Sequence, residues 1–137
     1  MAITTYAELK SSIADFLNRD DLSTIAADFI TLAEADIQRF VRHWRQEKRS
    51  NAQIDTQYSA IPADFLEDIR FYITSNDTSP LEKMSQSEIL QRKFETANTS
   101  GRPAYYALTA GEIEVYPVPD STYTAELYYY ARVPELS

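Results

Sequence analysis

The sequence contains no cysteine, only two glycines and a single histidine among its 137 residues. The absence of cysteine excludes disulfides, thiolate metal sites and a thiol nucleophile. Gly101 and Gly111 are too few for either common kind of glycine-rich loop that cradles phosphates. His43 alone cannot supply the several ligands that a histidine-based metal site needs. We therefore expect no metal and no cofactor.

Long apolar runs and positive charge are also scarce. No window approaches the ~18 apolar residues of a membrane span, and residues 1–6 lack the basic and apolar regions of a signal peptide. The chain has 21 acidic and 13 basic residues, a net charge of −8. Such a protein gains little from counterion release, so general affinity for nucleic acid is not expected. These features predict a protein made in the cytoplasm that binds no membrane.

Apolar residues make up 44% of the chain, far more than a disordered protein carries. Thr5 and Glu8 form a capping box that opens a first helix. A second helix is predicted from about residue 22 or 25 to about residue 46. Its apolar stripe consists of Ile25, Phe29, Leu32, Ala33, Ile37, Phe40, Val41 and Trp44. A short connector favours an antiparallel hairpin, and the wide stripes leave apolar surface for a further partner.

From residue 53 the hydrophobic period changes from 3.6 to 2, which predicts strands. The expected strands lie near residues 54–60, 69–73, 81–84, 105–109, 113–116 and 123–133, and the last three are predicted to form a β-meander. Ser85 and Glu88 form a second capping box, which opens a helix over about residues 85–96. In the last strand one face is expected to point inward, and Tyr128 and Tyr130 point to the opposite face. The inward set consists of Tyr123, Ala125, Leu127, Tyr129, Ala131 and Val133.

The predicted fold class is α+β. An N-terminal antiparallel helical hairpin over residues 1–50 is followed by a small antiparallel β unit over residues 51–137 with one inserted short helix. The two parts together are expected to form one compact domain, which suits the chain length.

His43 could act as a general base, but its basic, tryptophan-containing surroundings favour an ordinary surface or packing histidine. Paired carboxylates are the other acid–base candidates. They occur at Asp20/Asp21, Glu67/Asp68 and Glu112/Glu114. A glycosidase-like pair needs one acid in an apolar pocket. The first pair has the position of capping groups, and Glu112 and Glu114 alternate with apolar residues as on an outward strand face. We therefore do not expect an enzyme.

Basic residues cluster around the expected end of the second helix. Arg39, Arg42, Arg45, Lys48 and Arg49 are five of the 13 basic residues and surround Trp44. Cations at this place favour the helix macrodipole, so a solvated helix end is one interpretation. The functional interpretation is a docking patch for an acidic partner surface. Direct DNA binding by the patch is a third alternative, which the overall charge disfavours.

Tyrosines are concentrated near the C-terminus, where seven of ten lie between residues 105 and 130. Tyr128 and Tyr130 as adjacent outward aromatics favour an interface. A sheet face covered by another part of the same chain is an equally good interpretation. A small β-rich module that binds carbohydrate or peptide through a tyrosine-rich face is the alternative function.

An ordered series of segments covers nearly the whole chain: residues 5–10 (TYAELK), 14–22 (ADFLNRDDL), 28–35 (DFITLAEA), 61–67 (IPADFLE), 101–106 (GRPAYY) and 127–134 (LYYYARVP). The series resembles the phage adaptor, or head–tail connector, proteins of tailed phages and prophages. Proteins of that family commonly continue past the Ala-Arg-x-Pro segment into further helices, which would cover the face of Tyr128 and Tyr130.

The resemblance implies a structural virion protein of the neck with no catalytic residues. Such adaptors assemble as a ring, typically of twelve subunits, between the portal and the tail, stopper or nozzle protein. DNA passes through the lumen during packaging and ejection without sequence-specific binding. The helical part commonly faces the portal. The residues expected at the portal or subunit interface are Arg39, Arg42, Trp44, Arg45, Lys48, Arg49, Tyr128 and Tyr130.

Overall fold

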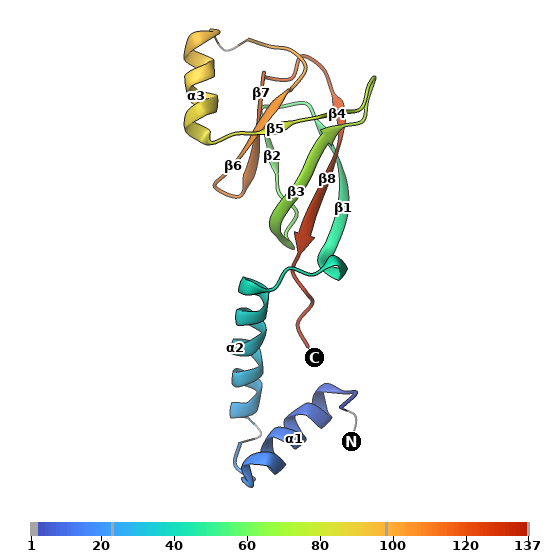
Figure 1. Cartoon of the computed structure of the whole chain (residues 1–137), viewed down its shortest axis with the longest axis vertical. Helices are drawn as coiled ribbons and strands as arrows, with labels where there is room; N and C mark the ends of the chain where they lie inside the picture. The colour runs from blue at the N-terminus through green and yellow to red at the C-terminus, as the bar shows by residue number, and fades with distance from the viewer. Residues whose placement is uncertain (1–2, 23, 98, 137) are drawn as a thin grey trace. The chain divides into compact units, whose positions relative to one another are not determined.

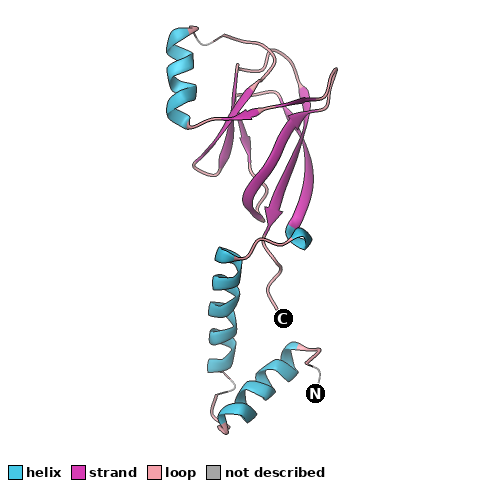
Figure 2. Cartoon of the chain, in the orientation of Figure 1, coloured by secondary structure: helices cyan, strands magenta, loops and turns pink. Residues whose placement is uncertain are grey.

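The computed structural model describes residues 3–22, 24–97 and 99–136. Its helices and strands confirm the α+β class (Figures 1 and 2). The chain divides into two compact units. The helical unit comprises Met1–His43 with Val133–Ser137, and the β unit comprises Trp44–Arg132. Within the described residues no helix is both long and apolar enough to cross a membrane.

The helical unit contains α1 (Tyr6–Leu17) and α2 (Ile25–Phe40). The predicted capping box is confirmed, because Glu8 N donates to Thr5 Oγ1 at 3.2 Å and Thr5 N donates to the Glu8 carboxylate at 3.1 Å. The C-terminal segment contacts α2 through two hydrogen bonds. The Gln38 amide donates to the carbonyl of Val133 at 3.2 Å, and Leu136 N donates to Glu34 at 2.9 Å.

The second helix ends earlier than predicted. It stops at Phe40 instead of about Gln46, and Val41 is extended at φ −91° and ψ 128°. Residues Trp44–Gln46 form a 3₁₀ turn, and Glu47 begins a strand. All eight residues of that strand find partners on another strand. Cooperative sheet pairing therefore overrides the helical apolar spacing that continues as far as Trp44.

The β unit contains two four-stranded sheets. In sheet A the order is β1 (Glu47–Ile54), β8 (Tyr123–Ala131), β3 (Phe65–Ile73) and β4 (Ser79–Pro80). In sheet B the order is β2 (Tyr58–Ala60), β7 (Glu112–Tyr116), β6 (Tyr105–Thr109) and β5 (Glu82–Lys83). All pairs are antiparallel except β5 with β6, so sheet B is mixed.

The predicted β-meander is wrong in its last step. The hairpin of β6 and β7 forms as expected, with Ala110 and Gly111 both at positive φ in its turn. However, β8 does not continue beside β7 and instead pairs with β1 and β3 in sheet A. The strand predicted over residues 54–60 is likewise divided between the two sheets, at the end of β1 and in β2. Period-two patterns specify which face is buried but not which strand is the neighbour.

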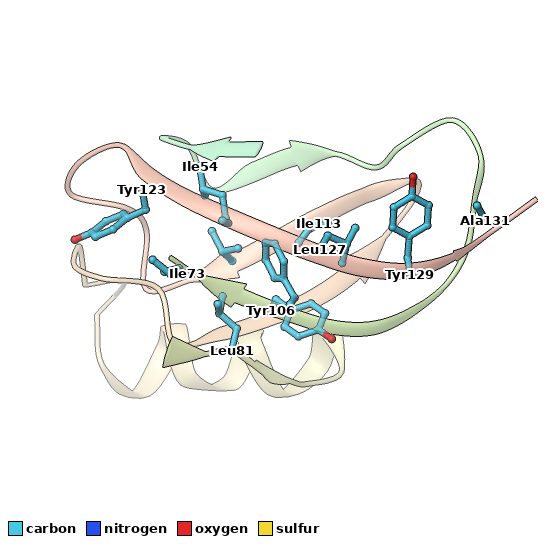
Figure 3. Close-up of a cluster of buried hydrophobic side chains, with 12 residues drawn as sticks. Ile54, Ile73, Leu81, Tyr106, Ile113, Tyr123, Leu127, Tyr129 and Ala131 are labelled. Atoms are coloured by element: carbon cyan, nitrogen blue, oxygen red, sulfur yellow. The ribbon is translucent and has the colours of Figure 1, made fainter. Parts of the chain in front are cut away.

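The main core lies between the two sheets (Figure 3). The predicted inward face of β8 is confirmed for Tyr123, Ala125, Leu127, Tyr129 and Ala131, which are all buried there. It is wrong for Val133, which lies beyond the end of the strand and is 46% exposed. They pack with residues from β1, β3, β6 and β7: Ile54, Phe71, Ile73, Tyr106, Ile113 and Val115.

A second cluster covers the other face of sheet B. Helix α3 (Gln86–Glu95) begins at its predicted capping box, formed by Ser85 and Glu88. Its buried Ile89 packs with Ala107 of β6 and Tyr116 of β7. Sheet B is therefore covered on both faces, by sheet A and by α3.

Hydrogen bonds from core tyrosines join the elements of the β unit. Tyr106 Oη of β6 donates to Asp68 Oδ2 of β3 at 2.6 Å, and Tyr129 Oη donates to Asp64 Oδ1 at 2.8 Å. Burial, together with the bond to the aspartate, raises the pKa of both phenols, and that of Tyr129 to about 12. Both phenols therefore stay neutral and act as donors at any physiological pH.

Candidate interaction surfaces

A groove of about 660 Å³ lies on the β unit where the 3₁₀ turn leads into β1. It forms because β1 pairs with β8 in a register that places Arg49 opposite Tyr128. This pairing brings the basic segment beside the tyrosine strand, which is far away in the sequence. We call it the basic groove and define it by its lining residues Trp44, Arg45, Glu47, Lys48, Arg49 and Tyr128.

Three cations line the basic groove, and each has a neighbour inside the β unit. The Arg45 guanidinium lies 5.2 Å from the centre of the Trp44 ring. Lys48 Nζ is 2.6 Å from Asp64 Oδ2, and Arg49 is 3.8 Å from the Glu126 carboxylate. The side chains of Lys48 and Arg49 are nevertheless 61% and 60% exposed. The groove therefore offers charge to a partner although its cations already have local contacts.

Local hydrogen bonds fix the charge states around the groove. The Lys48 ammonium and, to a lesser extent, the Tyr129 hydroxyl lower the pKa of the Asp64 carboxyl. A side-chain hydrogen bond with Tyr128, helped by the charge of Glu126, raises the pKa of Arg49. Asp64 and Arg49 therefore both remain charged near neutral pH.

Five of the eight residues expected at an interface line this groove: Trp44, Arg45, Lys48, Arg49 and Tyr128. The other three lie elsewhere. Tyr130 is half-buried on β8, opposite Glu47 on one side and Glu67 on the other. Arg39 lies in the last turn of α2 and Arg42 just beyond it, in the helical unit.

The expected helix-end role of the basic cluster is corrected accordingly. Arg42 does act at the C-terminus of α2, because its guanidinium donates to the carbonyls of Gln38 at 2.8 Å and Val41 at 3.1 Å. Arg45, Lys48 and Arg49 follow the end of the helix, so the macrodipole does not explain their positions. The interpretation of this part of the cluster as a solvated helix end is therefore wrong.

The helical unit exposes far more apolar surface than the sequence pattern indicated. Among the described residues of α1 and α2, only Ala26 and Ile30 are buried. Large apolar side chains remain exposed along α1 and α2 and just beyond them: Phe16, Leu17, Ile25, Phe29, Leu32, Ile37, Phe40 and Val41. Phe16 reaches 89% exposure and Phe40 75%. Apolar surface on this scale is typical of a protein–protein interface.

A smaller apolar site lies on the outer face of α3. Leu90 and Phe94 are 52% and 80% exposed and are separated by one helical turn. They line a hollow of about 430 Å³ together with Ser87, Gln91 and Glu95. The opposite face of the same helix is the one that packs on sheet B through Ile89.

Comparison with protein families decides what kind of protein carries these surfaces. The family model described as SU10 adaptor protein matches residues 4–137. The chain belongs to this family. The match confirms the resemblance to phage adaptor proteins that the sequence showed. It also supports the prediction that the protein is a structural component of a phage virion. A search of curated proteins finds no match.

The tyrosine concentration of the adaptor is explained largely by its core. Tyr106, Tyr116, Tyr123 and Tyr129 are all less than 8% exposed. The outer face of sheet A instead carries Tyr128, which stacks on Tyr72 with ring centres 6.0 Å apart. Most of the tyrosines that suggested a carbohydrate-binding face are therefore unavailable to a ligand.

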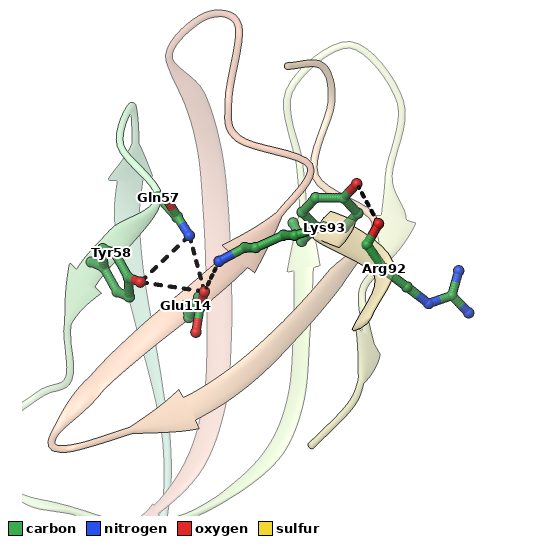
Figure 4. Close-up of polar contacts among 6 residues, drawn as sticks. Gln57, Tyr58, Arg92, Lys93 and Glu114 are labelled. Carbon is green, nitrogen blue, oxygen red and sulfur yellow. Dashed lines mark hydrogen bonds and ion pairs between the residues drawn. The ribbon is translucent and has the colours of Figure 1, made fainter. Parts of the chain in front are cut away.

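A buried ion pair in the adaptor corrects the expectation for Glu114. Glu114 was expected on an outward face together with Glu112, but it is only 2% exposed. Its carboxylate contacts Lys93 Nζ of α3, and Gln57 Nε2 donates to it at 2.9 Å (Figure 4). Tyr58 Oη adds a longer contact of 3.4 Å. Because α3 covers this face of sheet B, the carboxylate is buried and needs the cation.

The acidic residues in the described part of the chain have mostly local partners. Among the residues that the structure describes, no three side chains of His, Asp or Glu are grouped so that they could hold a metal ion. Asp21 accepts two hydrogen bonds from Arg19, and Asp68 accepts from Lys83 and Tyr106. These carboxylates serve local structure, which leaves the exposed surfaces as the candidate functional sites.

Proposed function

We propose that the protein is the head-to-tail adaptor of a tailed phage. Copies of the chain form a ring, of twelve subunits as in typical adaptors, that docks on the portal in the virion neck. The ring presents its other side to the tail, stopper or nozzle protein, and DNA passes through its lumen. The exposed apolar surface of the helical unit carries this proposal, because a helix pair that buries so little of its own apolar surface needs partners.

The overall charge supports the passage of DNA. With a net charge of −8, the ring carries a negative field that repels phosphates. A lumen lined by acidic residues would let the duplex slide without sticking. Sequence-specific readout would need basic side chains aimed at base edges, which this charge balance disfavours.

We further propose that the eight residues expected from the sequence form the contacts of the subunit with its neighbours in the neck. Arg39 and Arg42 belong to the helical unit, and Trp44, Arg45, Lys48, Arg49 and Tyr128 form the basic groove of the β unit. Tyr130 follows on the same sheet face as Tyr128. An aromatic and arginine-rich surface is the composition that protein interfaces favour.

Charge reversal tests the role of this surface in assembly on the portal. The double variant Arg39→Glu with Arg45→Glu is expected to reduce co-sedimentation with portal rings by roughly tenfold or more. Arg42 is left in place, because its hydrogen bonds stabilise the end of α2. Affinity is measured by pelleting at a fixed ionic strength, since screening weakens such contacts.

The matched control reverses two basic residues outside the proposed interface set, Lys10→Glu with Arg19→Glu, which changes the net charge by the same amount. Co-sedimentation of the control is expected to stay within about twofold of wild type. Equal losses in the two double variants would show a general charge effect and would reject the basic surface as an interface.

A further inference from the structure

The carboxylate of Asp36 lies in the middle of the exposed apolar face of α2, and Asp28 lies at the edge of that face. Ile25, Phe29, Leu32 and Phe40 follow each other at helical spacing and are 44%, 58%, 63% and 75% exposed. Asp36 is four residues from both Leu32 and Phe40, so it shares their face and is itself exposed. We call Asp36 and these four apolar residues the α2 stripe.

Any partner that covers the α2 stripe must neutralise Asp36. Burying an ionised carboxylate among apolar groups costs several kcal/mol unless a cation and hydrogen bonds compensate it. The apolar residues in turn need a partner with apolar or aromatic groups around that cation. The stripe therefore specifies its partner as an aromatic surface with a cation at its centre.

The basic groove of this same chain has that composition. Trp44 and Tyr128 supply aromatic rings to the groove, and Arg45, Lys48 and Arg49 supply its cations. Glu47 in the groove also matches Arg39, which lies one turn beyond Asp36 on α2. Charge and aromatic character are therefore complementary in both directions.

We propose that the α2 stripe of one copy docks in the basic groove of a neighbouring copy, where Asp36 pairs with Arg45. The contact is heterologous, since each copy offers its stripe to one neighbour and its groove to the other. Repetition of such a contact gives a ring when the rotation from copy to copy closes. A symmetric contact of stripe against stripe would instead close a pair of copies and could not by itself extend into a ring. This inference rests on the proposed adaptor function, because it names the contact that builds the ring.

The lack of cysteine allows a clean test by engineered disulfides. Ala33, exposed beside the stripe, and Glu47, in the groove, are each replaced by cysteine in separate variants. The two variants are mixed, assembled on portal rings and oxidised. Because each molecule holds one thiol, a disulfide between the two kinds of variant forms only between copies. With equal amounts of the two variants mixed at random, about half of the subunits at most can carry this disulfide, and we expect a yield close to that limit. The variant with both cysteines should form a ladder up to the full ring.

In the control mixture, the Ser87→Cys variant takes the place of the Glu47→Cys variant. Because Ser87 lies on the outer face of α3, it should form no disulfide with Ala33→Cys. Rings that assemble on the portal without a link between residues 33 and 47 would overturn the inference and leave the adaptor function standing. A wild-type chain that never joins the portal would instead overturn the proposed function.

A charge swap separates a neighbouring copy from other occupants of the groove. Asp36→Arg and Arg45→Glu are each expected to reduce ring assembly by roughly tenfold or more, and the double variant should recover most of the loss. If the groove binds an acidic segment of the portal, Asp36→Arg will not rescue Arg45→Glu. If it binds DNA phosphates, wild type will retain duplex DNA in a salt-dependent manner and Arg45→Glu will not. Either of these results would overturn the proposed contact.

Discussion

Replacing Lys93 by methionine is expected to lower the free energy of unfolding by about 3 kcal/mol. The substitution leaves the Glu114 carboxylate, whose side chain is 3% exposed, without its cation. Gln57 still donates a hydrogen bond to it, so the loss should fall at the lower end of the range for broken buried pairs. Urea denaturation of the purified chain measures this change.

The double variant Lys93→Met with Glu114→Gln is expected to recover most of that loss, because no buried charge is left uncompensated. Lys48→Met is the matched control, since it breaks the pair with Asp64 at a lysine that is 61% exposed. Its cost should stay below about 1 kcal/mol. If the double variant is no more stable than Lys93→Met alone, the loss comes from packing, and the account of a buried charge is wrong.

Replacing Leu32 and Phe40 together by glutamine is expected to abolish assembly while it leaves the folded subunit intact. Both side chains are more than 60% exposed, so the free energy of unfolding should change by no more than about 0.5 kcal/mol. If a neighbouring copy covers them, each is an apolar anchor of the interface. The loss of two such anchors should weaken assembly on the portal on the order of 100-fold or more.

Phe94→Gln provides the control for this prediction. Phe94 is 80% exposed, as much as Phe40, but it lies on α3 in the β unit. Its replacement should leave ring assembly unchanged, although it could alter the contact with another neck protein. Co-sedimentation with the portal measures assembly, and urea denaturation measures folding. Normal assembly of the Leu32→Gln, Phe40→Gln variant would show that the α2 stripe is not an interface.

Local signals in the sequence were sufficient for several elements. The capping boxes at Thr5 and Ser85 placed the starts of α1 and α3, because the cap and the third helical residue satisfy each other within one turn. The alternation around Tyr129 placed the inward face of β8, because side chains alternate along a strand. Each of these features depends on residues that are close together in the chain.

Features that depend on distant partners could not be predicted. The end of α2 is set by the pairing of β1 with β8, and the missing β-meander reflects the pairing of β8 with sheet A. Glu114 is buried because α3 covers sheet B, a packing that alternation along β7 does not reveal. From that alternation Glu114 was predicted to face solvent. Such a prediction is correct only where the second face of the sheet is open to solvent.

The basic groove could be predicted only in part, because it too depends on segments that are distant in the chain. The cluster of arginines and the outward Tyr128 were each visible as unusual residues in the sequence. Their meeting in one groove follows from the register of Arg49 with Tyr128, which joins segments from opposite ends of the β unit. The exposure of the α2 stripe was only partly predicted, because an apolar helical pattern is the same whether a core or a neighbouring subunit covers it.

The most direct test of the account is the mass of the complex that the wild-type chain forms with the portal ring of its own phage. Analytical ultracentrifugation or mass photometry of the two purified proteins gives this mass at increasing concentrations of the chain. We expect the mass to saturate at a portal ring that carries one closed ring of the adaptor. Portal rings whose mass does not change, beside a chain that remains monomeric at every concentration, would contradict the central claim.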